Sequence, residues 1–254
     1  MAGTIVSLDG HIVPLAEARV PVTDPAFTVG WAIFETMSAD QGQIPRLGAH
    51  LDRLAQSADS ALIPMPPRSL LEVELTALAR AHGGGCRIRL TLTGGGARVI
   101  VAEDLEEGRL FRSVRAVRGP HVDDPFLGGA VKHTSRAPWI VAVKRSGVDE
   151  VLRVDAHGRF TEATTAAIVA VVDGVIWTAP HDGRILASTT LNELLDRAAV
   201  LNLRVHREGA LAAGPWDGLY VASTTRVLAP VVELDGVALP GWDPVGTLLA
   251  GVEG

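Results

Sequence analysis

Residues 131–139 read VKHTSRAPW, residues 159–180 read RFTEATTAAIVAVVDGVIWTAP, and residues 185–195 read ILASTTLNELL. The first segment holds Lys132, one of two lysines in a chain with 23 lysines and arginines together. Lys132 follows the small, apolar residues 127–131, where a lysine loses hydration and its neutral, nucleophilic amine becomes accessible. Lys144 precedes Arg145-Ser146-Gly147 and has the pattern of a solvated helix end. Lys132 is therefore the candidate for covalent chemistry; the alternative is a strand-end lysine that reaches solvent.

Length and composition limit the classes of protein. The chain has 254 residues, enough for one large domain or two ordinary ones, and 47% hydrophobic residues predict a sizeable core. A net charge of -6 without a basic block argues against nucleic-acid binding. Cys86 is the only cysteine, and the scattered histidines lack metal-ligand spacing, so we expect no disulfide and no metal site. No apolar run is long enough to span a membrane and no signal pattern opens the chain, so we expect a cytoplasmic protein.

Turn signals and hydrophobic periodicity predict alternating strands and helices. In the first half of the chain we expect a hairpin over 4–15 about Asp9-Gly10, a strand over 30–37, a helix with Leu47, Leu51 and Leu54 on one face, a helix opened by the capping box Ser69–Glu72, and strands over 87–93 and 99–101. In the second half we expect a helix from about 138 to 145, strands over 151–154 and 159–162, a hairpin over 167–178 about Asp173-Gly174, a helix opened by the capping box Thr190–Glu193, and strands over 219–222 and 231–234. Arg87 and Arg89 alternate with apolar residues, so both should share one face of their strand.

Breaker residues mark one candidate linker. The segment 118–126 contains Gly119, Pro120 and Pro125 among polar residues. It would separate a small N-terminal domain over 1–117 from a larger domain over 127–254. The glycine triplets 83–85 and 94–96 fit neither a phosphate loop nor a dinucleotide fingerprint, which excludes those nucleotide sites.

Three further features supply the groups that a phosphorylated pyridine cofactor needs. Thr189-Thr190 lies at an expected helix N-terminus and Ser223-Thr224-Thr225 follows a strand, so both offer donors to a phosphate. Glu162 lies among small and apolar residues, where a carboxylate needs a partner such as a protonated ring nitrogen. With Lys132, these are the groups that bind pyridoxal phosphate. The alternatives are that Thr190 only caps its helix, that residues 223–225 are ordinary turn residues, and that Glu162 is a solvated edge carboxylate.

The chain resembles class IV pyridoxal-phosphate enzymes, the group of D-amino-acid transaminases, branched-chain transaminases and aminodeoxychorismate lyase. The marks of the group appear in order over nearly the whole chain: Phe34-Glu35-Thr36, His50-Leu-Asp-Arg-Leu54 with Ser57-Ala58, the segment at Lys132, Thr161-Glu162, Leu186 to Thr190, and Ser223-Thr-Thr225 with Pro230-Val-Val and Asp235-Gly236. The resemblance implies an α+β protein of fold type IV, with a smaller N-terminal α/β domain and a larger C-terminal β-rich domain.

The resemblance also implies roles for individual residues. Lys132 would form a Schiff base with pyridoxal 5′-phosphate and move the substrate proton, and Glu162 would pair with the ring nitrogen. Leu186 would pack behind the ring. The cofactor phosphate would be held by Arg53, Thr189, Thr190, Ser223 and Thr224; from the helical pattern alone, Arg53 would instead be a solvated surface residue. Phe34, Arg89, Thr225 and Arg136 are the expected substrate-binding residues, and members of the group are typically homodimers.

Three departures from the family pattern affect the expected substrate site. Ser188-Thr189-Thr190-Leu191 stands where the family often has Gly-Ile/Val-Thr-Arg, and the asparagine that follows the Glu162 motif in the family is absent. D-amino-acid transaminases hold the substrate carboxylate with an Arg-x-His pair, where this chain has Arg98-Val99-Ile100. Isoleucine offers no donor, so we expect Arg89 to bind the carboxylate, with Arg87, Arg98 and Arg136 as alternatives.

Two activities and one inactive state follow from these motifs. We favour a transaminase that moves the amino group of D-amino acids to 2-oxo acids such as 2-oxoglutarate or pyruvate, with activity on (R)-amines as well. Lys132-His133-x-x-Arg136 resembles the lysine segment of aminodeoxychorismate lyase, so formation of 4-aminobenzoate is the alternative. A non-catalytic homologue is a third reading, and retention of both Lys132 and Glu162 argues against it.

Overall fold

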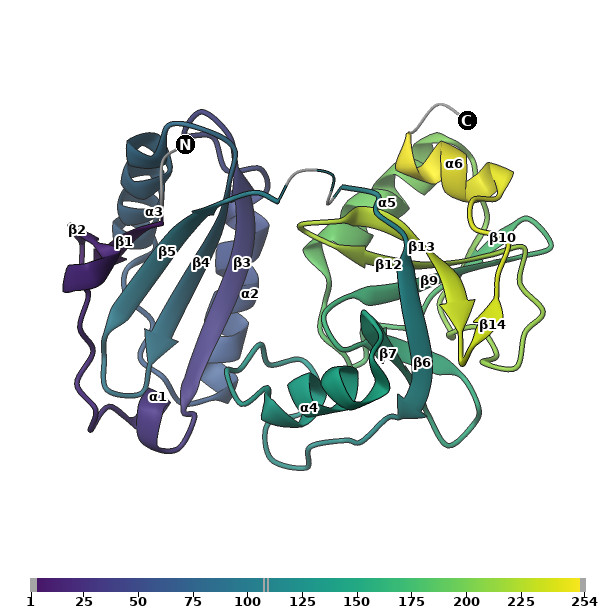
Figure 1. Ribbon diagram of the computed structural model, residues 1–254, viewed down its shortest axis with the longest axis horizontal. Helices are drawn as coiled ribbons and strands as arrows, with labels where there is room; N and C mark the ends of the chain where they lie inside the picture. Colours follow the sequence, from purple (N-terminus) through teal and green to yellow (C-terminus); the bar gives the residue numbers. More distant parts are fainter. Residues whose placement is uncertain (1–3, 107, 109, 252–254) are drawn as a thin grey trace. The chain divides into compact units, whose positions relative to one another are not determined.

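The computed structural model describes residues 4–106, 108 and 110–251, which divide into two compact units (Figure 1). The first unit comprises the described residues up to 106 together with Ala130–Arg136. The second comprises residues 108 and 110–129 and the chain from Ala137 onward. These boundaries differ from the expected linker over 118–126, because the strands of each unit pair differently from what we expected.

An antiparallel sheet in the order β2-β1-β5-β4-β3 forms the first unit. Its strands are β1 (Ile5–Leu8), β2 (His11–Pro14), β3 (Ala32–Ala39), β4 (Cys86–Thr93) and β5 (Arg98–Asp104). A 3-10 turn (Leu15–Glu17) and the short α1 (Pro25–Thr28) precede β3. The predicted hairpin at Asp9-Gly10 is confirmed: both residues have positive φ, +51° and +91°, as a two-residue turn of the favoured hand requires.

Two helices, α2 (Leu47–Ser60) and α3 (Arg68–His82), cover one face of this sheet (Figure 1). The core between them is formed by Ile33, Leu51, Leu54, Leu71, Leu75, Leu78, Ile88 and Leu90, all fully buried. On the other face the register places Thr36 opposite Arg89 and Ser38 opposite Arg87. The prediction that both arginines share one face is therefore confirmed.

Both predicted capping boxes are wrong. Helix α3 begins at Arg68 after Pro67, and no side chain caps it. Helix α5 (Thr189–Val200) begins after Ser188, whose hydroxyl accepts a hydrogen bond from the Leu191 amide. An N-cap residue needs a non-helical backbone, and Ser69 and Thr190 already lie inside the first turn of their helices.

The segment that carries Lys132 runs beside β3 of the first unit. The Phe34 amide donates to the Lys132 carbonyl at 2.9 Å, and the Thr134 amide donates to the Ala32 carbonyl at 2.9 Å. His133 forms an antiparallel bridge with Ile33. The expected domain over 127–254 included Lys132; the structure instead groups Lys132 with the first unit because these backbone hydrogen bonds attach it to β3.

The second unit is built on a sheet that closes on itself. Its strands are β6 (Val114–Pro120), β7 (Glu150–Val154), β8 (Phe160–Ala163), β9 (Ala167–Val172), β10 (Val175–Trp177), β11 (Val205–His206), β12 (Gly218–Ser223), β13 (Val227–Leu234) and β14 (Val237–Ala238). Their order is β11-β10-β9-β12-β13-β6-β7-β8, and β8 also pairs with β9, so the ring β9-β12-β13-β6-β7-β8 is closed. A core with side chains from all six ring strands fills it: Val114, Leu152, Phe160, Ala170, Val221 and Val231 are among its members.

Strand β6 occupies part of the segment expected to be a linker. Arg118 pairs with Leu152, and Pro120 pairs with Val154, in a parallel register with β7. Gly119 pairs with Arg153 in the same ladder, and a side chain does not fit there because a Cβ would approach Val151 Cγ1 to 2.5 Å. The glycine that suggested a break thus reflects a close strand contact, and residues 118–120 belong to the ring.

Three helices belong to the second unit: α4 (Ala137–Ser146), α5 and α6 (Pro244–Ala250). Helices α5 and α6 pack on the sheet through a second core that includes Val169, Val171, Leu191, Leu194, Tyr220 and Leu249. Lys144 is exposed in the last turn of α4, which confirms its expected place at a solvated helix end.

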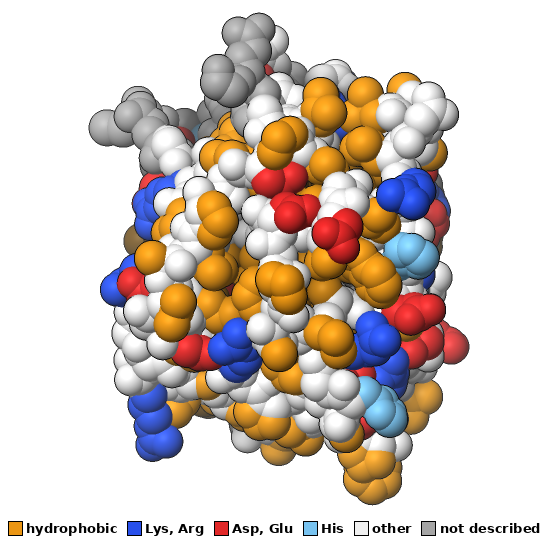
Figure 2. Space-filling model, turned by 90° about the vertical axis from the view of Figure 1, so that its right-hand side faces the viewer, with side chains coloured by type: hydrophobic (Ala, Val, Ile, Leu, Met, Phe, Trp, Pro, Cys, Tyr) orange, Lys and Arg blue, Asp and Glu red, His pale blue; other side chains and the backbone are white. Residues whose placement is uncertain are grey.

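The described residues can be compared with what a membrane span, a metal site or a nucleic-acid interface requires. Within the described part of the chain, no helix combines the length and apolar character needed to cross a membrane. Among the same residues, no group of three or more His, Cys, Asp or Glu side chains could hold a metal ion. On the face drawn in Figure 2, the coloured lysine and arginine side chains lie apart and mixed with acidic ones, without the basic stripe typical of a nucleic-acid interface.

Candidate active site

Lys132 is held against β3 by its backbone. Its amide donates to Ser57 Oγ at 3.2 Å, and its carbonyl accepts from the Phe34 amide. The preceding residue, Val131, is buried. The Lys132 Nζ lies 4.9 Å from the centroid of the Phe34 ring. The amine therefore lies over an aromatic ring, and its charge acts on Glu35; the covalent role of Lys132 stays a prediction.

A buried polar cluster lies on the helix-covered side of β3. Arg53 donates from Nε and NH2 to the two carboxylate oxygens of Glu35, each at 2.7 Å, and His50 Nδ1 lies 2.9 Å from Glu35 Oε2. Arg53 is only 7% exposed, so the alternative of a solvated surface arginine is wrong. The bidentate contact fixes the plane of the Arg53 guanidinium, and binding of the cofactor phosphate by Arg53 stays a prediction.

The cluster also fixes the charge of Glu35. Burial by itself raises the pKa of this carboxyl. Hydrogen bonds from His50 and Arg53, together with the charges of Arg53 and Lys132, outweigh burial and lower the pKa to about 2. Burial lowers the pKa of His50. Neither Glu35 nor His50 had an expected role, although both lie in motifs that resemble the family, Phe34-Glu35-Thr36 and His50-Leu-Asp-Arg-Leu54.

Arg89 lies on the opposite face of the first unit's sheet. Its guanidinium carbon is 3.6 Å from the centroid of the Phe34 ring. Burial lowers the pKa of Arg89, and the nearby charges of Arg87 and Arg136 lower it further. Among the described residues, no carboxylate forms an ion pair or hydrogen bond with the Arg89 side chain.

Two alternatives to Arg89 are already paired. Arg98 Nη2 lies 2.8 Å from Glu74 Oε1 on α3, and Arg87 forms an ion pair with Glu103. Ile100, which stands where a histidine was sought, is fully buried and opposite Leu90, on the helix-covered face of the sheet. Position 100 therefore faces away from Arg89 and Phe34.

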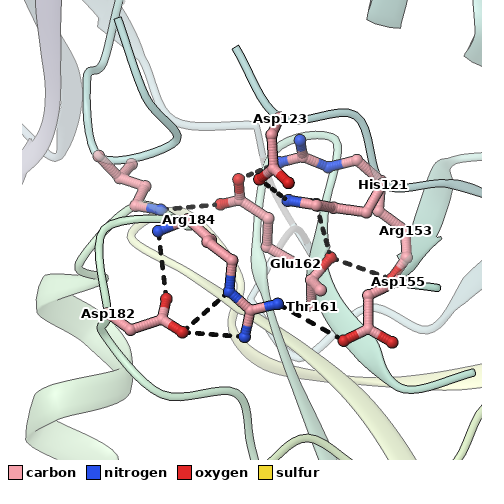
Figure 3. Close-up of polar contacts among 9 residues, drawn as sticks. His121, Asp123, Arg153, Asp155, Thr161, Glu162, Asp182 and Arg184 are labelled. Carbon is pink, nitrogen blue, oxygen red and sulfur yellow. Dashed lines mark hydrogen bonds and ion pairs between the residues drawn. The ribbon is translucent and has the colours of Figure 1, made fainter. Parts of the chain in front are cut away.

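In the second unit, Glu162 is a paired and largely buried carboxylate (Figure 3). Arg153 on β7 donates to one carboxylate oxygen, and the Leu186 amide donates to the other at 3.3 Å. The Glu162 side chain is 13% exposed, so the alternative of a solvated edge carboxylate is wrong. Each carboxylate oxygen can accept more than one hydrogen bond, so the group can still accept one from a protonated ring nitrogen.

Arg153 is a site residue that sequence reasoning missed. Its guanidinium carbon lies 4.5 Å from the centroid of the Trp139 ring, and its carbonyl accepts from the Thr161 hydroxyl at 3.2 Å. The Thr161 hydroxyl also lies 3.0 Å from His121 Nδ1 (Figure 3). The available signal was an arginine in the otherwise apolar strand 151–154, which pairs in an antiparallel register with the strand of Glu162.

The predicted phosphate donors lie at one helix end and one turn of the second unit. Because Ser188 caps α5, Thr190 is not needed as a cap, and that alternative is wrong. Within the described residues, the hydroxyls of Thr189, Thr190, Ser223 and Thr224 have no hydrogen-bond partner. Helix α5 packs against β12, the strand that ends at Ser223. A helix N-terminus with unpartnered hydroxyls suits a phosphate ester, so the donor set fits pyridoxal phosphate.

The amino-transferase class IV family model matches residues 32–234, which include every predicted site residue. The chain belongs to the class IV aminotransferase family. The class IV match confirms the predicted family, and with it a pyridoxal-phosphate-dependent aminotransferase.

Relatives of this class IV aminotransferase carry different substrate names. A putative branched-chain-amino-acid aminotransferase of Methanocaldococcus jannaschii is 28% identical, over 91% of this chain and 88% of that protein. A D-alanine aminotransferase of Listeria monocytogenes is 24% identical over the same shares. A bifunctional aminodeoxychorismate lyase / D-amino acid transaminase of Mycobacterium tuberculosis is 27% identical over 93% of both. The names divide between branched-chain and D-amino acids.

Solved structures show the same fold. A hypothetical aminotransferase from Mycobacterium tuberculosis in its PLP-bound form has a TM-score of 0.88 at 22% identity, and covers 98% of this chain and 96% of that one. A branched-chain aminotransferase from Thermoproteus uzoniensis has a TM-score of 0.87 at 23% identity, with 98% and 93% covered. The predicted α+β architecture of fold type IV is confirmed.

Proposed function

We propose that this class IV aminotransferase moves the amino group of D-amino acids to 2-oxo acids such as 2-oxoglutarate or pyruvate, and that Arg89 binds the substrate carboxylate. One observation supports the binding of the substrate carboxylate by Arg89. Arg89 is a partly desolvated cation beside two other arginines, without a carboxylate partner among the described residues. Such a cation favours an anion at its guanidinium, and the substrate supplies one.

We propose roles for the remaining groups. Pyridoxal phosphate, when bound, acts as the electron sink that lets the substrate α-carbon lose its proton. Lys132 Nζ accepts that proton and later returns it. Glu162, oriented by Arg153, would hold the proton on the ring nitrogen, and Leu186 would pack behind the ring. Arg53, Thr189, Thr190, Ser223 and Thr224 bind the phosphate. Phe34, Thr225 and Arg136 would each contact the substrate.

A single arginine at the substrate carboxylate sets the breadth of the substrate range. One charge-assisted hydrogen-bonding contact is worth about 1.5–3 kcal/mol, or roughly 10–150-fold in kcat/KM. Amines without a carboxylate forgo only this contact. We therefore expect measurable activity on an (R)-arylalkylamine beside the D-amino acids.

A matched pair of variants tests the role of Arg89. Both Arg89→Ala and Arg87→Ala remove an arginine from the same strand face, but Arg87 is already paired with Glu103. Initial rates are measured with D-amino acids, L-amino acids and an (R)-amine, each with 2-oxoglutarate. Arg89→Ala should lower kcat/KM for D-amino acids by about 10–150-fold and for the amine far less. Equal losses on both substrates, or an equal effect of Arg87→Ala, would refute this role; faster turnover of L-amino acids would refute the D preference.

A lyase is the second candidate, favoured by two observations. The Mycobacterium tuberculosis relative is named as a bifunctional aminodeoxychorismate lyase / D-amino acid transaminase. The motif Lys132-His133-x-x-Arg136 also resembles the lysine segment of the lyase. Incubation of the holoenzyme with aminodeoxychorismate should release pyruvate and 4-aminobenzoate if this activity is present. Release faster than transamination would make the lyase the main function.

We also propose that the chain forms a homodimer. Val22, Phe27 and Val29, close together in the first unit's sequence, are each more than two-thirds exposed. We infer that these side chains form an apolar patch of the kind that marks protein contacts. Light scattering should give twice the 26.7 kDa of one chain, and Phe27→Asp should shift the mass toward that of a monomer. A monomeric wild type would refute the proposal.

A cytoplasmic location is the last part of the proposed function. Its support is the single, buried and free Cys86, since disulfides mark oxidising compartments. Fractionation of the source cells, with the protein followed by antibody, tests it; recovery outside the cytoplasmic fraction would refute it.

A further inference from the structure

Glu150, the first residue of β7, is a buried carboxylate that the proposed chemistry does not use. It is 1% exposed. Oε2 accepts from the Thr164 hydroxyl and, at 2.9 Å, from the Thr165 amide. Oε1 accepts from the Thr165 hydroxyl and, at 2.7 Å, from Arg226 Nη1. Four donors therefore converge on one carboxylate inside the second unit.

These donors come from two turns that both adjoin proposed cofactor-binding residues. Thr164 and Thr165 lie in the turn that follows β8, which carries Glu162. Arg226 lies in the turn between β12 and β13, directly after residues 223–225. Glu150 thus joins the turn beside the proposed ring-nitrogen partner to the turn beside the proposed phosphate donors.

The second turn needs an anchor, because the backbone of the residue that follows it is strained. Val227 has φ +60°, in the left-handed region. A β-branched residue is unfavourable there, and such a conformation persists only where the surroundings hold it. The neighbouring Arg226 supplies two attachments: its side chain pairs with Glu150, and its amide donates to the Ser223 carbonyl at 3.1 Å.

We propose that Glu150 is a positioning residue for the cofactor phosphate: through Arg226 it fixes the turn 223–226, so that the Ser223 and Thr224 hydroxyls are presented as donors. The inference rests on the proposed function of this turn. Glu150 is buried and would act on the phosphate only through its partner Arg226. Its effect should therefore appear in recognition of the phosphate group, rather than only in the stability of the unit.

The test compares two ligands that differ by the phosphate. Apoprotein of the full chain is titrated with pyridoxal 5′-phosphate and with pyridoxal, and tryptophan fluorescence gives both dissociation constants. Glu150→Gln should reduce the preference for pyridoxal 5′-phosphate over pyridoxal by about tenfold or more, as expected for two hydroxyls that are no longer held in place. Arg226→Gln should reduce it similarly, the double variant should lose no more than either single one, and Arg226→Lys should retain most of it.

A second buried carboxylate supplies the matched control. Asp243 caps α6 and bonds to Tyr220 in the same unit, and its hydrogen bonds within the described residues go to neither turn. Asp243→Asn should lower the thermal midpoint while leaving the preference unchanged. If Glu150→Gln does not fold, Arg226→Gln and the Arg226→Lys rescue decide the question.

The outcomes separate this inference from the proposed function. A wild type without preference for the phosphorylated ligand would refute the phosphate site itself. A strong wild-type preference that survives Glu150→Gln or Arg226→Gln would leave the site intact and overturn the positioning role. The role would also be overturned if Asp243→Asn reduced the preference equally, because the effect would then be one of general stability.

Discussion

At the scale of single residues, Lys132 is distinguished from the other lysine by its surroundings. Lys132 lies over the Phe34 ring beside β3, whereas Lys144 is exposed at the end of α4. After reduction of the holoenzyme with borohydride, peptide mapping should place the pyridoxyl group on Lys132. Lys132→Ala should lose nearly all turnover while keeping affinity for the cofactor phosphate, and Lys144→Ala should behave as wild type. A pyridoxyl group on Lys144 would contradict the assignment.

Glu35 predicts how stability depends on pH. The pKa of Glu35 is lowered from 4.5 to about 2 in the folded chain. The unfolded state therefore binds the proton first, so the contribution of Glu35 is complete above about pH 4.5 and is lost as the pH falls toward 2. A pKa shift of this size corresponds to roughly 3 kcal/mol in the free energy of unfolding when Glu35 is fully ionised in both states.

Urea unfolding at pH 6, 4 and 3 measures this contribution. The free energy of unfolding of the wild type should fall more steeply over that range than that of Glu35→Gln. Glu103→Gln removes a half-exposed carboxylate of the same unit, one that pairs with Arg87, and should leave the slope nearly unchanged. Parallel curves for wild type and Glu35→Gln would show that Glu35 does not titrate as described.

At the scale of elements, Tyr220 on β12 connects the sheet of the second unit to α6. Its hydroxyl donates to the Asp243 carboxylate and accepts from the Asp243 amide at 2.8 Å. Asp243 in turn caps α6 through the Val245 amide. Tyr220→Phe leaves a buried amide and carboxylate oxygen without this partner, so we expect a loss of about 1–3 kcal/mol in the free energy of unfolding.

Thermal unfolding measures that loss, and absorbance gives an independent check. The chain has one tyrosine, so phenolate absorbance reports on this residue alone. Burial and the Asp243 carboxylate raise the pKa of Tyr220, and the phenol should stay protonated well above the usual pH. Ordinary titration, or an unchanged midpoint in Tyr220→Phe, would refute the connection.

Sequence patterns predicted the turns correctly where the turn requires residues that tolerate positive φ. The turns at Asp9-Gly10, Asp173-Gly174 and Asp235-Gly236 all have positive φ at both residues, which few other residue pairs tolerate. Signals that depend on distant neighbours failed. Gly119 is typical of a break in the sequence, yet it lies in a strand that pairs with β7, where Val151 leaves no room for a side chain.

Much of the candidate site could be named from the sequence, but its supporting contacts could not. Motifs identified Lys132, Glu162 and Arg53 one by one. The pairing of Glu162 with Arg153, and of Arg53 with Glu35, depends on which strands and helices become neighbours in the fold. Single-chain patterns do not encode that adjacency, so the partners of buried charges were missed.

At the scale of the whole molecule, each of the two units packs around buried hydrophobic side chains of its own. Leu71, Leu75 and Leu78 belong to the first unit's core, whereas Leu191 and Leu194 belong to the second unit. The lysine segment is grouped with the first unit although most of its flanking sequence belongs to the second. The chain therefore passes between the units more than once, and the domains are not simple consecutive halves.

Because each unit has buried side chains of its own, we expect that the apoprotein does not unfold in one step, since separate units commonly break two-state behaviour. Trp31 lies in the first unit, and Trp139, Trp177, Trp216 and Trp242 lie in the second. Tryptophan fluorescence should therefore follow mainly the second unit, while far-ultraviolet circular dichroism follows both, and the two urea transitions should not coincide.

Matched core truncations assign the transitions. Leu78→Ala and Leu194→Ala each remove a buried leucine from a helix, α3 and α5, and each should cost about 2–5 kcal/mol. Leu194→Ala should shift the fluorescence transition to lower urea concentration. Leu78→Ala should shift to lower urea only the unfolding of the first unit, which circular dichroism detects and fluorescence largely does not. If both probes coincide in the wild type and both variants move them together, the two units unfold as one cooperative body.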